Sequence, residues 1–250
     1  MIRQDAAAHC YRGPLKAVLF DWAGTTIDFG SRAPMAVFVQ VFGEHGVALS
    51  EAEARAPMGM AKRAHIDALL KNPAIAQRWR DRHGRSPEER DVDRLYEAFL
   101  PVQMRCLRNH ADVLPGVAEV VVACRQRGMK IGSSTGYTRE MMDVLMPLAA
   151  ERGYRPDAML CASDLAEGRP APWLNLENAR RLGVYPLEAI LVVDDTCVGI
   201  QAGRNAGMWT VGVVRTGNEV GLSRDALAAL PRDQRDRLLI AASDRLADAG

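Results

Sequence analysis

The sequence predicts an α/β fold in which a parallel β-sheet carries an inserted α-helical domain. Three short apolar runs are each followed by a polar or glycine-containing turn and helical sequence, at residues 17–20, 130–133 and 189–193. This alternation is typical of βαβ units. Similar runs at residues 158–161 and 209–214 supply two further strands. We therefore expect a Rossmann-like parallel sheet as the core.

A long interruption separates the first predicted strand from the second. Its apolar residues recur at helical spacing, with little of the alternation that marks β-strands. We expect helices at residues 33–45, 50–70 with a break near Pro57, and 88–106, and turns at residues 71–73 and 83–87. The sequence thus predicts a helical cap domain, residues 31–108, inserted into an α/β core domain of residues 1–30 and 109–250.

The charge balance bounds the kind of partner. The 250 residues include 31 acidic and 32 basic side chains, so no long-range field would capture nucleic acid or an anionic membrane surface. No segment approaches the about 20 consecutive apolar residues that span a bilayer, and the first residues lack the apolar run of a secretion signal. We expect a cytoplasmic protein that acts on a small molecule and binds neither nucleic acid nor membrane.

Polar side chains follow the predicted strands. Ligands of open parallel sheets bind beyond the carboxyl ends of the strands, so these residues are candidates for a site. They are Asp21 after the first strand, Ser134-Thr135-Gly136 after the second, the pair Asp194-Asp195 after residues 189–193, and Arg169 in the loop beyond residues 158–161. A carboxylate, a hydroxyl, a cation and an acidic pair at one edge fit phosphoryl transfer.

Each of these groups has a chemical use. Asp21 can attack phosphorus to give an aspartyl-phosphate. Mg²⁺ would relieve the repulsion between the two anions, with oxygen ligands such as Asp21, Asp195 and a backbone carbonyl. Thr135 and Arg169 would hold the other phosphoryl oxygens. Taken singly, such residues also serve as turn formers, helix caps or solvated charges, and it is their joint occurrence at strand ends that favours chemistry.

Four ordered motifs, DWAGTT, GSSTGYT, GRPAPW and VVDDTCVGI, resemble those of the haloacid dehalogenase superfamily. The resemblance implies a sheet core of that type with an inserted cap. In most phosphatases of the superfamily, the residue two places after the nucleophile is an aspartate that protonates the leaving oxygen. Ala23 stands there and cannot do so. Because an alkoxide leaves poorly without a proton, a carbon leaving group is the better interpretation, and an imine formed by a lysine would accept its electrons.

Lys62 is the candidate for that lysine. A helix through residues 57–70 would put Lys62 on the same face as Met58, His65, Ile66 and Leu69. Partial burial would lower the pKa of the amine and make it available to attack an aldehyde. The commoner alternative is a lysine whose stem packs on apolar neighbours while its head reaches water.

With PMGMAKRAH at residues 57–65, STGYTREMM and NAGMWTVGV, the chain resembles the phosphonoacetaldehyde hydrolase family from about residue 16 to residue 222. The resemblance implies that Lys62 forms a Schiff base and that Asp21 takes the phosphoryl group, so that phosphonoacetaldehyde gives acetaldehyde and phosphate. It also implies a homodimer and a Mg²⁺ cofactor. The resemblance further implies that Asp21, the Ala23 carbonyl and Asp195 are the metal ligands. It implies that Thr135 and Arg169 bind the phosphoryl group, and that Met58, His65 and Tyr137 lie near the lysine or the substrate.

The fourth motif departs from one pattern of the family. Some members have Gly-Asp followed four residues later by a second aspartate, whereas this chain has Asp194-Asp195 and then Gly199. We expect Asp194 to hold metal-bound water in an outer position. Two other functions remain open from the sequence: a magnesium-dependent phosphatase or phosphomutase of the same superfamily, and a catalytically silent binding protein of that fold.

Overall fold

The structure is a computed structural model that describes residues 11–250, and it contains a five-stranded parallel sheet. The strands follow the spatial order β3-β2-β1-β4-β5, which confirms the predicted α/β class. Their bounds are β1 Ala17–Phe20, β2 Lys130–Thr135, β3 Ala158–Cys161, β4 Ile190–Asp194 and β5 Trp209–Gly212. The first residues of the predicted core segment, 1–10, lie outside the described residues.

Alternate residues of β1 bury against opposite layers. Ala17 and Leu19 belong to the cluster that contains Ala179 and Leu182, whereas Val18 and Phe20 face the other main cluster. The helices of the core are α6 Val117–Gln126, α7 Arg139–Glu151, α8 Trp173–Leu182 and α9 Cys197–Asn205. Helix α8 packs on β2 and β3, α9 on β4 and β5, and α6 on β2. Both faces of the central strands are therefore apolar, as parallel sheets require.

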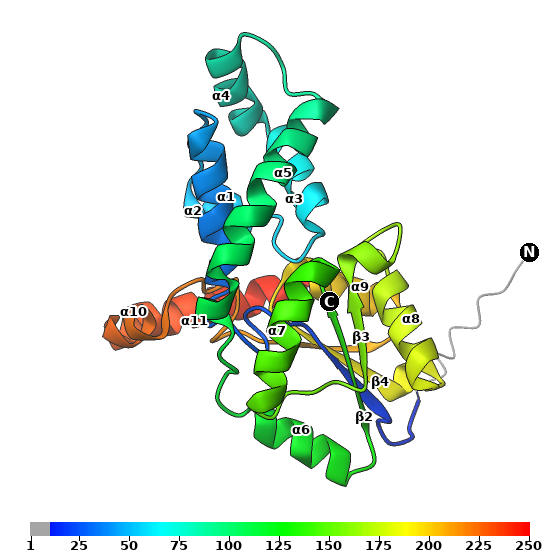
Figure 1. Cartoon of the computed structure of the whole chain (residues 1–250). Helices are drawn as coiled ribbons and strands as arrows, with labels where there is room; N and C mark the ends of the chain where they lie inside the picture. Colours follow the sequence, from blue (N-terminus) through cyan, green and yellow to red (C-terminus); the bar gives the residue numbers. More distant parts are fainter. Residues whose placement is uncertain (1–10) are drawn as a thin grey trace, which may run out of the picture.

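The segment between β1 and β2 folds as helices. Their bounds are α1 Arg32–Glu44, α2 Glu51–Arg55, α3 Lys62–Lys71, α4 Pro73–His83 and α5 Glu89–Cys106, followed by the 3-10 helix η1 Leu107–His110. Figure 1 shows α1 to α5 standing together, away from the helices that flank the sheet. The helical character of this segment is as predicted, and its division from the core as a separate domain stays a prediction.

Aromatic packing holds these helices together. Val92, Leu95 and Phe99 lie on one buried face of α5, and the Phe99 ring stacks on Phe38 of α1 at 4.5 Å between centroids. The same apolar cluster continues through Trp22 and reaches the sheet. The insert is therefore anchored to the strand ends by burial.

The break predicted near Pro57 within residues 50–70 is confirmed, but it is longer than expected. Helices α2 and α3 are separated by six residues that include Pro57 and Gly59, so the helix expected through residues 57–61 is wrong. Gly59 adopts φ +95°, which a helix cannot contain. Met58 therefore does not share a helical stripe with Lys62, although both side chains are buried.

Helix α4 was not predicted, because residues 71–73 were interpreted as a turn. The same residues start the helix: the Asn72 side chain accepts hydrogen bonds from the backbone N–H groups of Ala74 and Ile75, and Pro73 occupies the first helical position. Two helices near the carboxyl end, α10 Arg224–Ala229 and α11 Arg232–Ala249, were also not predicted. Among residues 11–250, no helix combines the length and apolar character needed to cross a membrane.

Candidate active site

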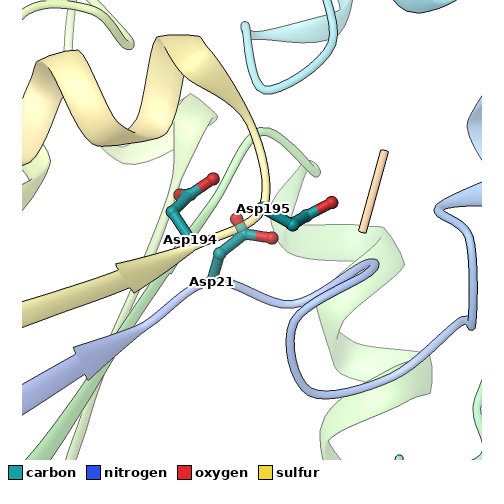
Figure 2. Close-up of side chains that lie close together, drawn as sticks. All are labelled: Asp21, Asp194 and Asp195. Carbon is teal, nitrogen blue, oxygen red and sulfur yellow. The ribbon is translucent and has the colours of Figure 1, made fainter. Parts of the chain in front are cut away.

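Parallel register brings the predicted carboxylates together. Phe20 pairs with Val193 of β4 and with Ser133 of β2, so the next residues, Asp21 and Asp194, emerge side by side. The backbone N–H of Asp21 donates to the Val193 carbonyl at 3.0 Å. Figure 2 shows Asp21, Asp194 and Asp195 gathered where β1 and β4 end. Each offers a carboxylate oxygen within 4.8 Å of the other two, and all three are buried.

The turn after Asp21 is shaped to receive Asp195. Gly24 has φ +88°, and a Cβ there would lie 2.1 Å from Oδ2 of Asp195. The Thr25 hydroxyl donates to Oδ1 of Asp195 at 2.8 Å. The Gly-Thr of DWAGTT thus leaves room for Asp195 and then holds it.

Arg169 is the buried cation of the cluster. Its Nη1 lies 2.7 Å from Oδ1 of Asp21 and 3.0 Å from Oδ2 of Asp194, and its Nη2 donates to the carbonyl and the hydroxyl of Ser134. Burial opposes the charge of the guanidinium, but Asp194 and Asp21 outweigh burial and raise the pKa of Arg169. One arginine therefore faces three carboxylates.

The remaining negative charge fits a divalent cation. Burial and the neighbouring Asp194 raise the pKa of Asp21 to about 7, against the pull of Arg169. Burial and Asp21 also raise the pKa of Asp195. Oδ2 of Asp194 lies 3.0 Å from Nη1 of Arg169, and within residues 11–250 no hydrogen-bond partner is found for it. Buried, under-compensated carboxylate oxygens are the donor set of a hard cation, so these residues can hold a metal.

The Asp194 side chain occupies space that a side chain at position 199 would need. In the other family pattern, position 194 is glycine and position 199 is aspartate. A Cβ on Gly199 would lie 2.0 Å from the Asp194 carboxyl carbon, so side chains at both positions cannot coexist without a shift. Oδ1 of Asp194 accepts hydrogen bonds from the backbone N–H and the hydroxyl of Thr196. A side chain at position 199 would thus compete with Asp194 for the same space. The outer position predicted for Asp194 stays a prediction.

Lys62 begins α3 and faces the same cavity as Asp21. Its side chain is 4% exposed, and its Nζ lies 4.9 Å from the ring centroid of Tyr137 and 5.9 Å from that of Phe38. Burial lowers the pKa of Lys62 to about 8, although Asp21 acts in the opposite direction. Lowering it from 10.5 to about 8 raises the neutral fraction at pH 7 about 300-fold. Desolvation thus makes the amine a nucleophile.

His65 lies one turn beyond Lys62 on α3. Its Nε2 is 2.9 Å from the Ala54 carbonyl, which can only accept, so Nε2 carries the proton and Nδ1 is an acceptor. No hydrogen-bond partner is found for the buried Nδ1 among the described residues. Burial and the neighbouring Lys62 hold the pKa of His65 well below its usual value. The imidazole is therefore neutral at pH 7.

The other predicted residues join the same cavity. Ala23, Met58, Thr135 and Tyr137 line it together with Asp21 and Lys62, and Tyr137 is buried with a strongly raised pKa caused first by burial. Arg169 reaches it through Asp21. His65 does not line this cavity; it packs beside it, with its ring stacked on Phe38 and its Nε2 at the Ala54 carbonyl. The individual roles of the predicted residues stay predictions.

Two glycines allow the helical insert to approach the core. A Cβ on Gly59 would lie 2.5 Å from the Thr196 hydroxyl, and a Cβ on Gly136 would lie 2.4 Å from the Met60 carbonyl. These contacts press the loop before α3 against the ends of β2 and β4. Lys62 is consequently held over the strand-end carboxylates.

Three contributors were missed from the sequence. Ser134 was named only as part of a strand end, yet its hydroxyl accepts from Arg169. Thr25 lies inside the first motif, which was the available signal. Asn218 donates its backbone N–H to Oδ2 of Asp195 at 2.7 Å, and a backbone donor leaves no trace in residue type.

The sheet order and the acidic cluster define a hydrolase of the haloacid dehalogenase type, and a family model of haloacid dehalogenase-like hydrolases matches residues 15–207. The phosphonoacetaldehyde hydrolase of Nitratidesulfovibrio vulgaris is 50% identical over 240 residues, or 96% of this chain and 86% of the relative. That of Hahella chejuensis is 47% identical, with 96% of this chain and 82% of the relative covered.

A solved structure agrees with these relatives. The phosphonoacetaldehyde hydrolase-like protein of Oleispira antarctica superposes with a TM-score of 0.92 at 42% identity, over 95% of this chain and 86% of that one. The chain therefore belongs to the phosphonoacetaldehyde hydrolase family. The predicted resemblance is confirmed, and the protein is an enzyme of this class.

The exchange between positions 194 and 199 can be tested directly. Gly199→Asp alone should destabilise the fold by about 1–3 kcal/mol, because the new side chain meets the Asp194 carboxylate. The double variant Asp194→Gly, Gly199→Asp should recover stability and divalent-cation affinity. Thermal unfolding and calorimetric titration would measure both. A double variant no better than Gly199→Asp would contradict the shared position.

The ionisation of Lys62 is measurable by NMR of ¹³C-labelled lysine. The chain has four lysines, Lys16, Lys62, Lys71 and Lys130, so the signals can be assigned with Lys62→Arg. Lys62 should be an ammonium below pH 8 and neutral above it, with a midpoint of about 8. Exposed Lys71, whose pKa its hydrogen bond to Asp67 raises, is the internal control.

Asp21→Asn should lower the pKa of Lys62 further, since the Asp21 carboxylate favours the ammonium form. A Lys62 midpoint equal to that of Lys71 would contradict the account of its burial.

Proposed function

We propose that this enzyme hydrolyses the carbon-phosphorus bond of phosphonoacetaldehyde to give acetaldehyde and phosphate, as a step in the degradation of 2-aminoethylphosphonate. One observation carries the proposal: a buried lysine of lowered pKa shares a cavity with a strand-end aspartate, in a chain with alanine at the usual acid position. The names of the relatives support the same reaction.

Lys62 supplies the electron sink. Its neutral amine would add to the aldehyde carbon, and loss of water would give an imine, which takes up a proton. When the carbon-phosphorus bond breaks, its electron pair moves into a new carbon-carbon double bond and the iminium becomes an enamine. Protonation of that enamine at carbon and hydrolysis of the imine return Lys62 and release acetaldehyde.

Asp21 would receive the phosphoryl group. A carboxylate oxygen attacks phosphorus as the enamine leaves, and water then cleaves the aspartyl-phosphate to phosphate. Since the leaving atom is carbon and its electrons go to nitrogen, no side chain has to protonate a leaving oxygen. Ala23 is compatible with this reaction and incompatible with efficient ester hydrolysis.

The acidic cluster would hold Mg²⁺. Asp21, Asp195 and the Ala23 carbonyl are the proposed ligands, with Asp194 beside them. The bound ion would supply charge neutralisation between nucleophile and phosphoryl oxygens. Asp21 can act as a nucleophile only when ionised. Because burial and Asp194 raise the pKa of Asp21, a neighbouring cation would be needed to favour the ionised form.

The other cavity residues would position the substrate. Thr135 and Arg169 would bind phosphoryl oxygens, and the ion pairs of Arg169 with Asp21 and Asp194 fix the orientation of its fork. His65 would stay neutral and take part in proton traffic to the imine through a hydrogen bond accepted at Nδ1. Met58 and Tyr137 would exclude water around the lysine, which limits premature hydrolysis.

The inserted helices would act as a cap domain, residues 31–108, that closes Lys62 over Asp21. The close contacts of Gly59 and Gly136 support a closed arrangement. We also expect a homodimer with its contact on the cap, which light scattering of the purified protein would test.

The rival functions are weaker. A phosphatase or phosphomutase would lack its acid at position 23 and would leave buried Lys62 without a role. A silent binding protein would not retain all four motifs in contact with one cavity. Sugar phosphate turnover without cleavage of phosphonoacetaldehyde would establish the first rival, and loss of metal binding would favour the second.

Borohydride reduction with phosphonoacetaldehyde tests the proposed function. Peptide mass mapping should locate one adduct at Lys62 and none at Lys16, Lys71 or Lys130. Lys62→Arg should form no adduct, and its kcat should fall at least about 1,000-fold. The reason is that the high pKa of arginine keeps the guanidinium charged, so it cannot act as a nucleophile. The matched control Lys71→Arg, at an exposed position of the same helix, should keep both. Absence of an adduct at Lys62 while substrate binds would falsify the proposal.

A further inference from the structure

Helix α2 is tied to the core by one arginine. Nη1 of Arg55 donates to the Gly30 carbonyl at 2.8 Å and to Oδ1 of Asn218 at 3.1 Å, and its Nη2 donates to the Gly221 carbonyl at 2.8 Å. Asn218 and Gly221 belong to the loop of residues 213–223 between β5 and α10. Arg55 thus joins the inserted helices to a loop that lies almost 170 residues further along the chain.

That loop also holds a carboxylate of the acidic cluster. The backbone N–H of Asn218 donates to Oδ2 of Asp195 at 2.7 Å, while its side-chain Nδ2 lies 3.4 Å from the Arg55 carbonyl. Asn218 therefore faces Asp195 with its backbone and Arg55 with its side chain. Two hydrogen bonds separate the helical insert from Asp195.

Two glycines of the loop make both contacts possible. A Cβ on Gly217 would lie 2.6 Å from the Asp195 Cβ, and a Cβ on Gly221, at φ +69°, would lie 2.7 Å from Nε of Arg55. The loop is shaped to pack closely on Asp195 at one end and on Arg55 at the other.

We propose that Arg55 and Asn218 are positioning residues that couple the placement of helix α2 to the orientation of the Asp195 carboxylate. The coupling deepens the proposed function, because it would assemble the cation site only when the insert lies over the core. Movement of α2 away from the core breaks the bonds of Arg55 to Asn218 and Gly221, so the loop loses its support on that side. By thermodynamic linkage, a cation bound at the carboxylates must in turn favour the closed position of α2.

Asn218→Ala and Arg55→Met test the coupling. Asn218→Ala keeps the backbone donor to Asp195 and removes the side-chain contacts with Arg55, together with a 3.3 Å hydrogen bond to the neighbouring Glu219. Each variant should bind Mg²⁺ about 10-fold more weakly by calorimetry, and the double variant should be no weaker than either single one. The matched control is Arg78→Met, which removes the ion pair between Arg78 of α4 and Glu53 of α2, a contact that stays inside the insert. The Mg²⁺ affinity of this control should remain within about twofold of the wild-type value.

Hydrogen exchange gives a second readout that needs no substrate. In the wild-type chain, Mg²⁺ should slow exchange of backbone amides in residues 51–62, and in Asn218→Ala that protection should disappear. Unchanged Mg²⁺ affinity in both variants, or fully additive losses, would overturn the proposal. So would protection that persists in Asn218→Ala. If Arg55→Met fails to fold, the Asn218→Ala measurements decide alone.

These outcomes are separable from the proposed function. A wild-type chain that binds Mg²⁺ with the expected coupling but forms no adduct at Lys62 refutes the carbon-phosphorus chemistry and retains the coupling. A chain that forms the adduct at Lys62 but shows no coupling refutes the coupling and retains the carbon-phosphorus chemistry.

Discussion

The convergence of three buried carboxylates at one edge of a parallel sheet is the constraint from which the rest of the site follows. Register alone puts Asp21 beside Asp194, and Asp195 follows directly. One arginine cannot neutralise three carboxylates, and burial together with the neighbouring carboxylates raises the pKa values of Asp21 and Asp195. The site is therefore suited to receive a hard cation, and the turn of DWAGTT is built around one of the carboxylates rather than around an acid at position 23.

The protonation state of Lys62 also depends on the three carboxylates. The negative cluster favours an ammonium, whereas burial under the inserted helices disfavours it, and burial has the larger effect. Because a neutral amine is needed, the closeness of insert and core matters chemically as well as structurally. Gly59 and Gly136 allow that closeness, and Arg55 with Asn218 extends it to Asp195. The contact between the inserted helices and the core thus determines the position of Lys62 and supports the position of Asp195.

The sequence predicted what depends on strand order and missed what depends on tertiary contact. Strand-end residues such as Asp21 and Thr135 could be placed together because parallel strands end at one edge. The helical stripe predicted to join Met58 to Lys62 is wrong, because the φ of Gly59 breaks that helix, although both residues line the same cavity. Asn and Pro are common both in turns and at the start of helices. Because Asn72-Pro73 was interpreted as a turn, α4 was not predicted. Asn218 acts through its backbone N–H, which any residue except proline could supply.

The mass of the reduced Lys62 adduct in Asp21→Asn tests the central claim, that Lys62 activates the leaving carbon and Asp21 removes the phosphoryl group from it. With phosphonoacetaldehyde and borohydride, the wild-type chain should yield an ethyl group on Lys62, because cleavage precedes reduction. Asp21→Asn should yield a phosphonoethyl group, since the imine forms but its carbon-phosphorus bond stays intact. An ethyl adduct in Asp21→Asn would contradict the account.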